Sequence, residues 1–417
     1  NTGNFLKWMG LSVLTGLVVG GASAVFAGCI KAATEYRDTH NWIFMLLPVA
    51  GVLIVFMYEK IGRQDGGTNQ VLATIKSKDD VPFLSAPLIF VSTLLTHLTG
   101  GSAGREGASI QFGGSIGNWL GKLAHLDEFD HHVMIMCGMS AAFAAVFGTP
   151  MAAAVFAMEV VSVGVMYYAA LLPCVIAAII AAEFATGMGI DPETFPVHSI
   201  PGLTVETGLK MALIAVGCGI LSILFCILLK TVGQLYAKYL KNPYIRIVVA
   251  AGVIILITIC LNTKDYMGAG SGLIARAIEK GEARPLDFLW KMLLTALTMR
   301  AGYRGGEIVP AFSIGATFGC VAGGILGFSP ELAAAASMVA LFCGVTNCPI
   351  TAMLISFELF GFSGAAYYLI AISISYAVSG YYSLYKDQTI VYSKYKAKYI
   401  NKHTKTVSYT HLTLPTT

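Results

Sequence analysis

Charged residues are scarce in this chain. Lys, Arg, Asp and Glu make up 12% of its 417 residues, whereas hydrophobic residues make up 56%, and the mean hydropathy is +0.71. Soluble domains carry about 25% charged residues, so the composition excludes a soluble protein and predicts an integral membrane protein in contact with lipid. The formal net charge of +4 is small and scattered, which excludes a nucleic-acid partner.

The motifs of metal sites and disulfide frameworks are also missing. The nine cysteines contain no C-x-x-C pair and stand mostly in apolar stretches, so we interpret them as buried thiols. Neither an H-E-x-x-H sequence nor the G-K-[ST] of a P-loop occurs. We therefore expect no metal, no cofactor and no enzymatic activity.

Long uncharged runs recur along the chain. The clearest are Leu11–Ile30, Val160–Ala182, Met211–Leu229 and Gly361–Leu384, each close to the about 20 residues that cross a bilayer as a helix. Shorter runs between them fit tilted or partial helices. We predict an all-α integral membrane fold with many tilted transmembrane helices.

Two glycine-rich segments interrupt the apolar sequence. They are Gly101–Ser109 (GSAGREGAS) and Gly302–Phe312 (GYRGGEIVPAF), and each brings a carboxylate to a predicted helix start. Non-helical backbone survives at bilayer depth only where it is buried in protein or lines a cavity. Paired breaks in the two halves of a chain indicate the binding site of a transporter.

The two halves also repeat each other. The same offset of 199 residues relates Pro150 to Pro349 and Glu159 to Glu358. We expect a first membrane half at residues 1–200, a second at residues 201–400, and a non-native or disordered tail at residues 401–417, which ends in SYTHLTLPTT. For the two glutamates we favour helix capping or a subunit interface over a place in a pathway.

The broken helices carry the chemistry of anion binding. A helix start exposes unpaired N–H groups and about half a positive charge, so it attracts anions, and glycine lets the backbone approach an ion closely. Helix starts are predicted at GSAGREG, at GGEIVP and at GGTNQV, where Thr68 and Asn69 add polar side chains. We predict that these three ends meet around a small anion.

Glu106 is the candidate gate and proton carrier. An ionised carboxylate beside such a helix start can occupy the place of the anion, whereas the protonated acid loses that attraction and can swing away. The structural alternative is a helix-start glutamate paired with Arg105. Ionisable residues inside membranes are usually functional, so we favour the gating role.

In these segments the chain resembles the CLC family of chloride channels and transporters. GREGAS at Gly104–Ser109 is similar to the family's GREGP signature, GGTNQV to its GSGIP element and GGEIVP to its GxFxP element. The resemblance implies a homodimer with one anion pathway per subunit, running through an inverted two-half repeat. The basic run YSKYKAKYINKHTK near the C-terminus is expected in the cytoplasm, and we expect a bacterial inner membrane.

The resemblance also implies roles for single residues. Glu106 corresponds to the external gating glutamate, Thr68 to the serine whose hydroxyl contacts the central anion, and the amides of Glu307 and Ile308 to the backbone donors of the third element. SLYKDQ makes Tyr385 the central tyrosine. Tyr381 and Tyr382 remain alternatives. The candidate anion-binding set is Thr68, Asn69, Arg105, Gly107, Glu307, Ile308, Val309 and Tyr385.

Two features place the resemblance nearest the fluoride-exporting branch of the family. Val160 stands where chloride/proton exchangers have an inner proton glutamate. Chloride channels and the fluoride branch also lack that glutamate. Gly67, Asn69 and the GGEIVP element are closer to the GNNLI-like and GGEVTP-like elements of that branch, in which aromatic residues line the fluoride path. Phe312 is a candidate for such a residue.

The resemblance therefore implies a fluoride/proton antiporter that is gated by Glu106 and exports fluoride. A chloride channel or a chloride/proton antiporter of the same fold is the first alternative. A membrane-embedded enzyme that uses Glu106 and Glu307 as acid and base is the second.

Overall fold

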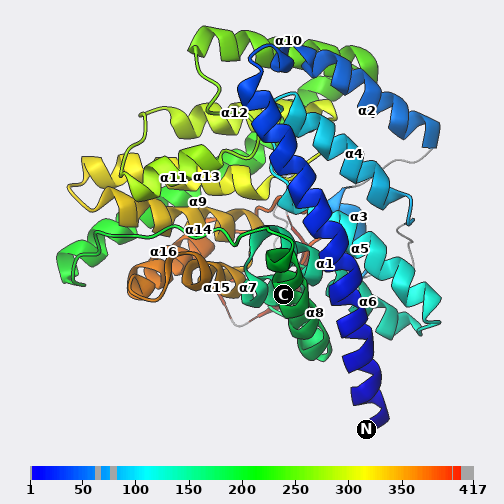
Figure 1. Ribbon diagram of the computed structural model, residues 1–417. Helices are drawn as coiled ribbons and strands as arrows, with labels where there is room; N and C mark the ends of the chain where they lie inside the picture. Colours follow the sequence, from blue (N-terminus) through cyan, green and yellow to red (C-terminus); the bar gives the residue numbers. More distant parts are fainter. Residues whose placement is uncertain (1, 62–66, 76–81, 397, 405–417) are drawn as a thin grey trace, which may run out of the picture.

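A computed structural model describes residues 2–61, 67–75, 82–396 and 398–404 of the chain. Sixteen α-helices, among these residues, form one helical body (Figure 1). The first eight are α1 (Thr2–Thr39), α2 (Leu47–Ile61), α3 (Thr68–Thr74), α4 (Ser85–Leu98), α5 (Glu106–Leu123), α6 (Glu128–Phe147), α7 (Pro150–Glu159) and α8 (Leu171–Gly187). Short 3₁₀ turns precede α2 (Ile43–Leu46) and α8 (Tyr168–Ala170).

The second eight helices repeat the order of the first. They are α9 (Val205–Tyr239), α10 (Pro243–Leu261), α11 (Ser271–Glu279), α12 (Asp287–Ala301), α13 (Ile308–Ile325), α14 (Pro330–Thr346), α15 (Pro349–Phe360) and α16 (Ala365–Val378). Corresponding pairs of helices pack in the same way. Helix α5 lies along α6, and α13 lies along α14; likewise α1 contacts α8, and α9 contacts α16. An extended connector, residues 188–204, joins the two sets.

Small residues allow the inner helices to pack closely. A Cβ on Gly113 in α5 would lie 2.2 Å from the Gly138 carbonyl oxygen of α6, and one on Gly319 in α13 would lie 2.3 Å from the Ala333 oxygen of α14. Neither position can carry a side chain without moving the helices apart. Small residues at helix contacts are typical of membrane proteins, and these two contacts hold α5 and α13, the helices that begin at the predicted site.

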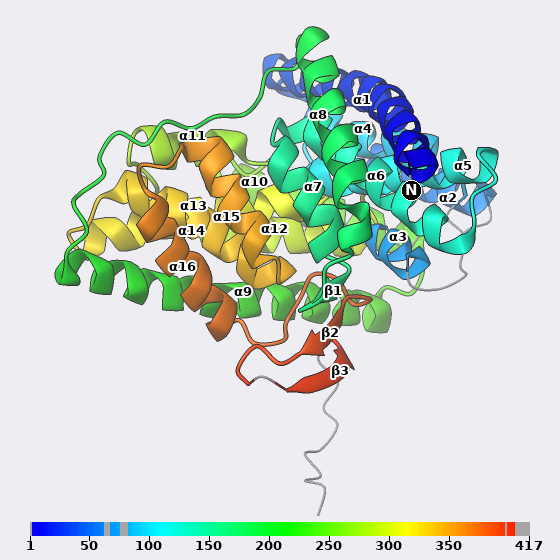
Figure 2. The same cartoon turned by 90° about the horizontal axis from the view of Figure 1, so that it is seen from below.

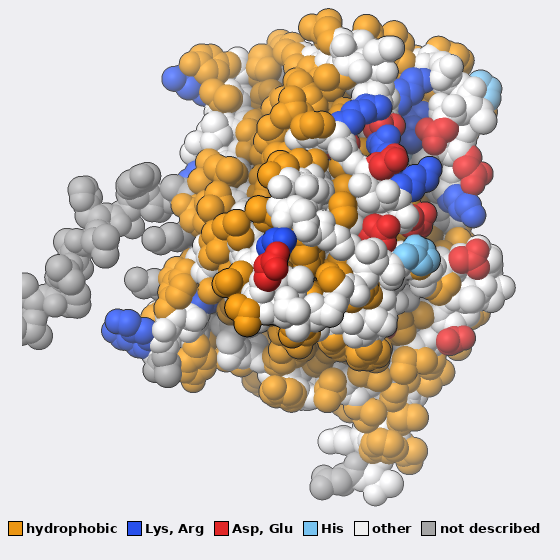
Figure 3. Space-filling model, turned by 90° about the vertical axis from the view of Figure 1, so that its left-hand side faces the viewer, with side chains coloured by type: hydrophobic (Ala, Val, Ile, Leu, Met, Phe, Trp, Pro, Cys, Tyr) orange, Lys and Arg blue, Asp and Glu red, His pale blue; other side chains and the backbone are white. Residues whose placement is uncertain are grey.

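The outer surface of the body is apolar. Seven helical stretches among the described residues are long and apolar enough to cross a membrane. They are α1, α6, α9, α10 and α13, and α2 and α8 taken together with the 3₁₀ turns that precede them. Hydrophobic side chains fill the middle of the face drawn in Figure 3, and acidic and basic side chains gather toward its right-hand edge. The all-α membrane fold expected from the composition is confirmed.

Two of the predicted runs are not single spanning helices. Gly361–Leu384 contains only α16, a helix of 14 residues. The uncharged run Val160–Ala182 is not one helix, because α7 ends at Glu159 and α8 begins only at Leu171. Between them the chain forms strand β1 (Ser162–Val163) and turns at Gly164, whose φ is +89°. Uncharged residues fill this turn, so hydropathy alone does not reveal it.

A small sheet covers one face of the body. Strand β1 pairs in parallel with β2 (Thr389–Tyr392), and β2 pairs in antiparallel with β3 (Tyr399–His403). Figure 2 shows this sheet on the face opposite the connector 188–204. Strand β3 takes in residues 401–403, the beginning of the predicted tail, whereas residues 405–417 lie outside the described part of the chain.

Candidate functional site

The two glycine-rich segments meet through their backbones. The Gly104 N–H donates to the Gly306 carbonyl at 2.8 Å, and the Gly306 N–H donates to the Gly104 carbonyl at 2.7 Å. A Cβ on Gly107 would lie 2.8 Å from the Gly306 Cα, so only glycine permits this approach. The structure therefore brings the starts of α5 and α13, one from each half, to one place.

The start of α3 joins them. Gly67 precedes the helix with a φ of +63°, a conformation that favours glycine, and the Thr68 hydroxyl donates to the Gly107 carbonyl at 3.0 Å. The hydroxyl proton of Thr68 is thus directed at a backbone oxygen in this conformation. The Asn69 amide oxygen, by contrast, is buried without a hydrogen-bond partner in the described part of the chain.

Glu106 lies at the first position of α5 with only 1% of its surface exposed. Its Oε2 accepts a hydrogen bond of 3.0 Å from the Arg105 N–H, and its Oε1 lies 3.4 Å from the Arg105 Nε. The carboxylate is therefore folded back over the start of its own helix, where an anion would be attracted. The predicted pairing with Arg105 and the predicted place at the helix end are both present.

Arg105 makes further contacts. Its Nη2 donates to the Val146 carbonyl at 3.3 Å and to Glu193 Oε1 at 3.1 Å. Glu193 belongs to the connector, which passes over this side of the body. One guanidinium thus lies between two carboxylates from distant parts of the sequence.

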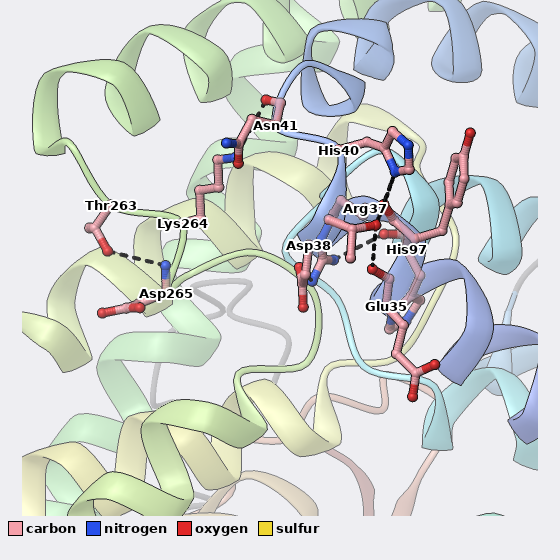
Figure 4. A network of polar contacts seen from close by, with 11 residues as sticks. Glu35, Arg37, Asp38, His40, Asn41, His97, Thr263, Lys264 and Asp265 are labelled. Carbon is pink, nitrogen blue, oxygen red and sulfur yellow. Dashed lines mark hydrogen bonds and ion pairs between the residues drawn. The ribbon is translucent and has the colours of Figure 1, made fainter.

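A cavity of about 580 Å³ reaches Glu106, and Glu193 of the connector forms part of its lining. Its lining combines the end of α1, His97 of α4, Arg105, Glu106, Glu193 and residues 264–272. Figure 4 shows part of the rim, where Arg37 lies between Asp38 and the His97 carbonyl, to which it donates at 3.0 Å. Charged side chains around the cavity therefore surround the approach to a buried acid, Glu106.

The α13 side of the site is formed by backbone. Glu307 precedes the helix, Ile308 and Val309 are 1% exposed, and Pro310 stands in the first turn. The Glu307 side chain points toward Arg300, with 3.9 Å between the charged atoms. Its carboxylate is thus paired outside the cluster of helix starts, while the first N–H groups of α13 remain without intrahelical acceptors.

Of the three candidate tyrosines, Tyr385 is the buried one, with 3% exposure. Its carbonyl accepts a hydrogen bond of 2.7 Å from the Thr404 hydroxyl. The Tyr381 hydroxyl lies 2.9 Å from the Ser393 hydroxyl near the sheet, and Tyr382 is half-buried. Burial distinguishes Tyr385 from the other two, and its role as the central tyrosine stays a prediction.

Gln388 was not predicted from the sequence. Its amide nitrogen donates to the Val160 and Thr346 carbonyls at 3.0 and 2.8 Å, and its amide oxygen accepts from Asn347 and Ser383. Val160, Thr346 and Asn347 lie far from Gln388 in the sequence, and Ser383 lies in an irregular loop. No local sequence pattern could therefore indicate that Gln388 binds them. Gln388 fixes the segment that carries Tyr385.

Phe312 belongs to an aromatic stack. Its ring centroid lies 5.5 Å from that of Phe147 and 5.2 Å from that of Phe342, and the side chain is fully buried. These contacts pack α13 against α6 and α14. In the described residues, no group of three His, Cys, Asp or Glu side chains is arranged to hold a metal ion.

A helical membrane body of two similar halves, with three helix starts meeting below a charged cavity, has the architecture of an anion channel or transporter. Residues 50–380 match the family model described as voltage gated chloride channel. The chain therefore belongs to the CLC family.

Several relatives are similar over nearly the whole chain. The chloride/fluoride channel protein of Pseudomonas syringae pv. tomato is 34% identical over 400 residues, which cover 93% of this chain and 88% of that protein. The H(+)/Cl(-) exchange transporter ClcA of Vibrio cholerae is 25% identical over 382 residues, covering 84% and 81%.

Solved structures agree with this assignment. The crystal structure of a CLC-type fluoride/proton antiporter matches with a TM-score of 0.89 at 31% identity, covering 94% of this chain and 99% of that one. A slow cyanobacterial Cl-/H+ antiporter matches with a TM-score of 0.79 at 16% identity, covering 89% and 94%, which supports the fold alone.

Proposed function

We propose that this protein exchanges fluoride for protons across a bacterial inner membrane and exports fluoride. The observation that carries the proposal is the position of Glu106, whose carboxylate covers the start of α5 at the base of the cavity. An ionised carboxylate and a small anion both accept charge-assisted hydrogen bonds from the same N–H donors. One side chain can therefore alternate with the transported anion.

The cycle follows from the charge of Glu106. While it is ionised, the carboxylate is held by the Arg105 N–H and guanidinium and blocks the anion. Protonation removes the negative charge, which weakens these charge-assisted contacts, so the side chain leaves and the anion takes its place. Each departure from the helix start carries a proton, and the return of the carboxylate displaces the anion.

Anion binding is assigned to the three helix starts. The donors are the first N–H groups of α3, α5 and α13, near Asn69, Gly107, Ile308 and Val309, with Tyr385 toward the side of the sheet. Helix starts attract anions through unpaired N–H groups and the helix dipole. A permanent cationic side chain in the path is therefore not required.

Fluoride is preferred to chloride as the substrate for three reasons. Gly67 and Asn69 keep the first element of the fluoride branch. Val160, in the place of an inner proton glutamate, disfavours a chloride/proton exchanger, although chloride channels share this feature. The Pseudomonas relative is named a chloride/fluoride channel protein, and the related antiporter structure is of the fluoride/proton type. A chloride/proton antiporter or a chloride channel is the alternative.

The assembly and topology belong to the same proposal. We expect a homodimer, two membrane halves at residues 1–200 and 201–400, and the sheet of β1, β2 and β3 at the cytoplasmic face. The connector and the charged cavity then face the outside of the cell. A transport role is favoured over an enzymatic one because the backbone of Glu307, and not its paired side chain, lies at the site.

A flux assay tests the proposal. The purified protein is reconstituted in liposomes, and fluoride and chloride electrodes record anion movement while a pH electrode records protons. We expect a pH gradient to drive fluoride uphill, and Glu106→Gln to abolish the proton movement. Passive fluoride flux without proton movement, coupling that survives Glu106→Gln, or movement of chloride in place of fluoride would each contradict it.

A further inference from the structure

We propose that Glu193 is a positioning residue for the gate, because its carboxylate competes with Glu106 for Arg105 and holds the guanidinium when Glu106 leaves. The inference rests on the proposed function and extends it to the connector. It assigns the connector, which supplies no residue to the predicted anion site, a part in setting when the gate opens.

The geometry places one cation between two acids. Glu193 Oε1 lies 3.1 Å from Arg105 Nη2, and Glu106 Oε1 lies 3.4 Å from Arg105 Nε. The two acids differ in their access to water, since the Glu193 side chain is 22% exposed and that of Glu106 only 1%. Both acids line the cavity, and Glu193 is the more water-accessible of the two.

Glu193 is held in place by the connector. The Phe195 N–H donates to the Leu359 carbonyl at 3.0 Å, and Pro192 packs so closely on Gly148 that a Cβ on that glycine would lie 2.6 Å from the Pro192 Cα. Contacts on both sides of Glu193 therefore fix its backbone against α15 and the end of α6. The Glu193 carboxylate is therefore held against Arg105.

The charges determine the consequence. Two carboxylates around one guanidinium leave a net negative charge, which disfavours ionisation of both acids at once. Burial raises the pKa of Glu193, and Arg105 opposes that change. Without the Glu193 charge, Arg105 would serve Glu106 alone and stabilise its ionised, closed form. A higher external proton concentration would then be needed to open the gate.

Other charged groups line the same cavity, and they are unchanged in a variant that alters Glu193 alone. They are Lys31, Glu35, Arg37 and Asp38 from α1, His97 from α4, and Lys264 and Asp265 from the segment before α11. Lys291 of α12 lies deeper and donates to Ser102, Tyr266 and Gly268.

The experiment measures fluoride flux from liposomes against external pH, with internal pH fixed. For Glu193→Gln we expect the half-maximal point to move by about one unit toward lower pH, roughly tenfold in proton concentration, with the maximal rate at low pH retained. Glu193→Asp keeps the charge and is expected to restore most of the profile. Glu35→Gln, which removes a carboxylate of the same cavity, is the control and should shift the profile far less.

A second background separates positioning from a purely structural role. In Glu106→Gln, which lacks the gate carboxylate, adding Glu193→Gln should leave fluoride flux unchanged, whereas a structural defect would lower it there too. An unshifted Glu193→Gln profile, a shift no larger than that of Glu35→Gln, or a uniform loss of flux at all pH values would overturn the inference. Absence of proton coupling in the unmodified protein would instead refute the proposed function.

Discussion

Glu159 and Glu358 each cap the helix that carries the other. The Glu358 carboxylate of α15 accepts 2.9 Å hydrogen bonds from the two N–H groups that follow Pro150 at the start of α7. The Glu159 carboxylate of α7 accepts bonds of 3.0 and 2.8 Å from the two N–H groups that follow Pro349 at the start of α15. This exchange joins the two halves by an equivalent contact in each direction.

Removing either cap should destabilise the protein more than it impairs transport. We expect Glu159→Gln or Glu358→Gln to lower the free energy of unfolding by about 1–2 kcal/mol, the usual cost of losing a helix cap. Thermal unfolding in detergent measures the loss, with Glu279→Gln on the exposed end of α11 as the control. Normal stability combined with lost proton coupling would instead place these acids in the pathway.

The meeting of the broken helices depends on glycine. In Gly306→Ala the new Cβ would lie 2.5 Å from the Gly107 nitrogen, so we expect the starts of α5 and α13 to separate and fluoride flux to fall at least tenfold. Gly324→Ala, near the end of α13, is the control, because no atom lies within 4 Å of its Cβ position. It should be neutral or stabilising by up to about 1 kcal/mol. Similar flux in both variants would show that the close approach is dispensable.

Thr68 and Asn69 should differ in their effects on fluoride binding. The Thr68 hydroxyl already donates to Gly107, whereas the Asn69 amide oxygen has no hydrogen-bond partner among the described residues, so a rotation that presents the amide N–H group to an anion breaks no bond of that oxygen. A hydrogen bond to a charged group contributes about 1.5–3 kcal/mol. We therefore expect Asn69→Ala to raise the KM for fluoride at least tenfold and Thr68→Val to change it less. A larger increase in KM for Thr68→Val than for Asn69→Ala would show that the Thr68 hydroxyl, and not the Asn69 amide, contacts the anion.

Gln388 should be needed for the position of Tyr385. Gln388→Leu leaves the carbonyls of Val160 and Thr346 without their donor in a buried site, which costs about 1–3 kcal/mol for each such group. We expect lower stability and lower flux, both followed on the same preparation. Lys386→Gln, at an exposed position two residues away, should leave both unchanged. If Gln388→Leu behaves like that control, the segment is held by other contacts.

The helix starts could be predicted from the sequence because their physics is local. Glycine, proline and a carboxylate beside an apolar run indicate a broken helix without knowledge of its neighbours. The 199-residue offset placed Glu159 and Glu358 at equivalent positions, for which capping or a subunit interface was expected, and the structure shows that both cap helices. Which helix each would cap depends on the packing of α7 against α15, and hydropathy contains no such information.

Contacts between distant segments were not predictable in this way. Glu193 stands in an irregular connector and Gln388 in a short loop, and neither has a periodic or motif context. Glu193 meets Arg105 across a long stretch of the same half, and Gln388 meets Val160 of the other half, so both pairs form only in the folded protein. The wrong span at Val160–Ala182 has a related cause, since a turn made of uncharged residues is satisfied by backbone contacts to β2.

The reciprocal bonds between Gly104 and Gly306 constrain how this protein can work. Any rocking of one half against the other would have to break two peptide hydrogen bonds in a water-poor interior, where each unmade bond is expensive. A turnover cycle that moves only side chains avoids this loss. A cycle carried by the Glu106 side chain therefore leaves the junction between the two glycine-rich segments intact at every step.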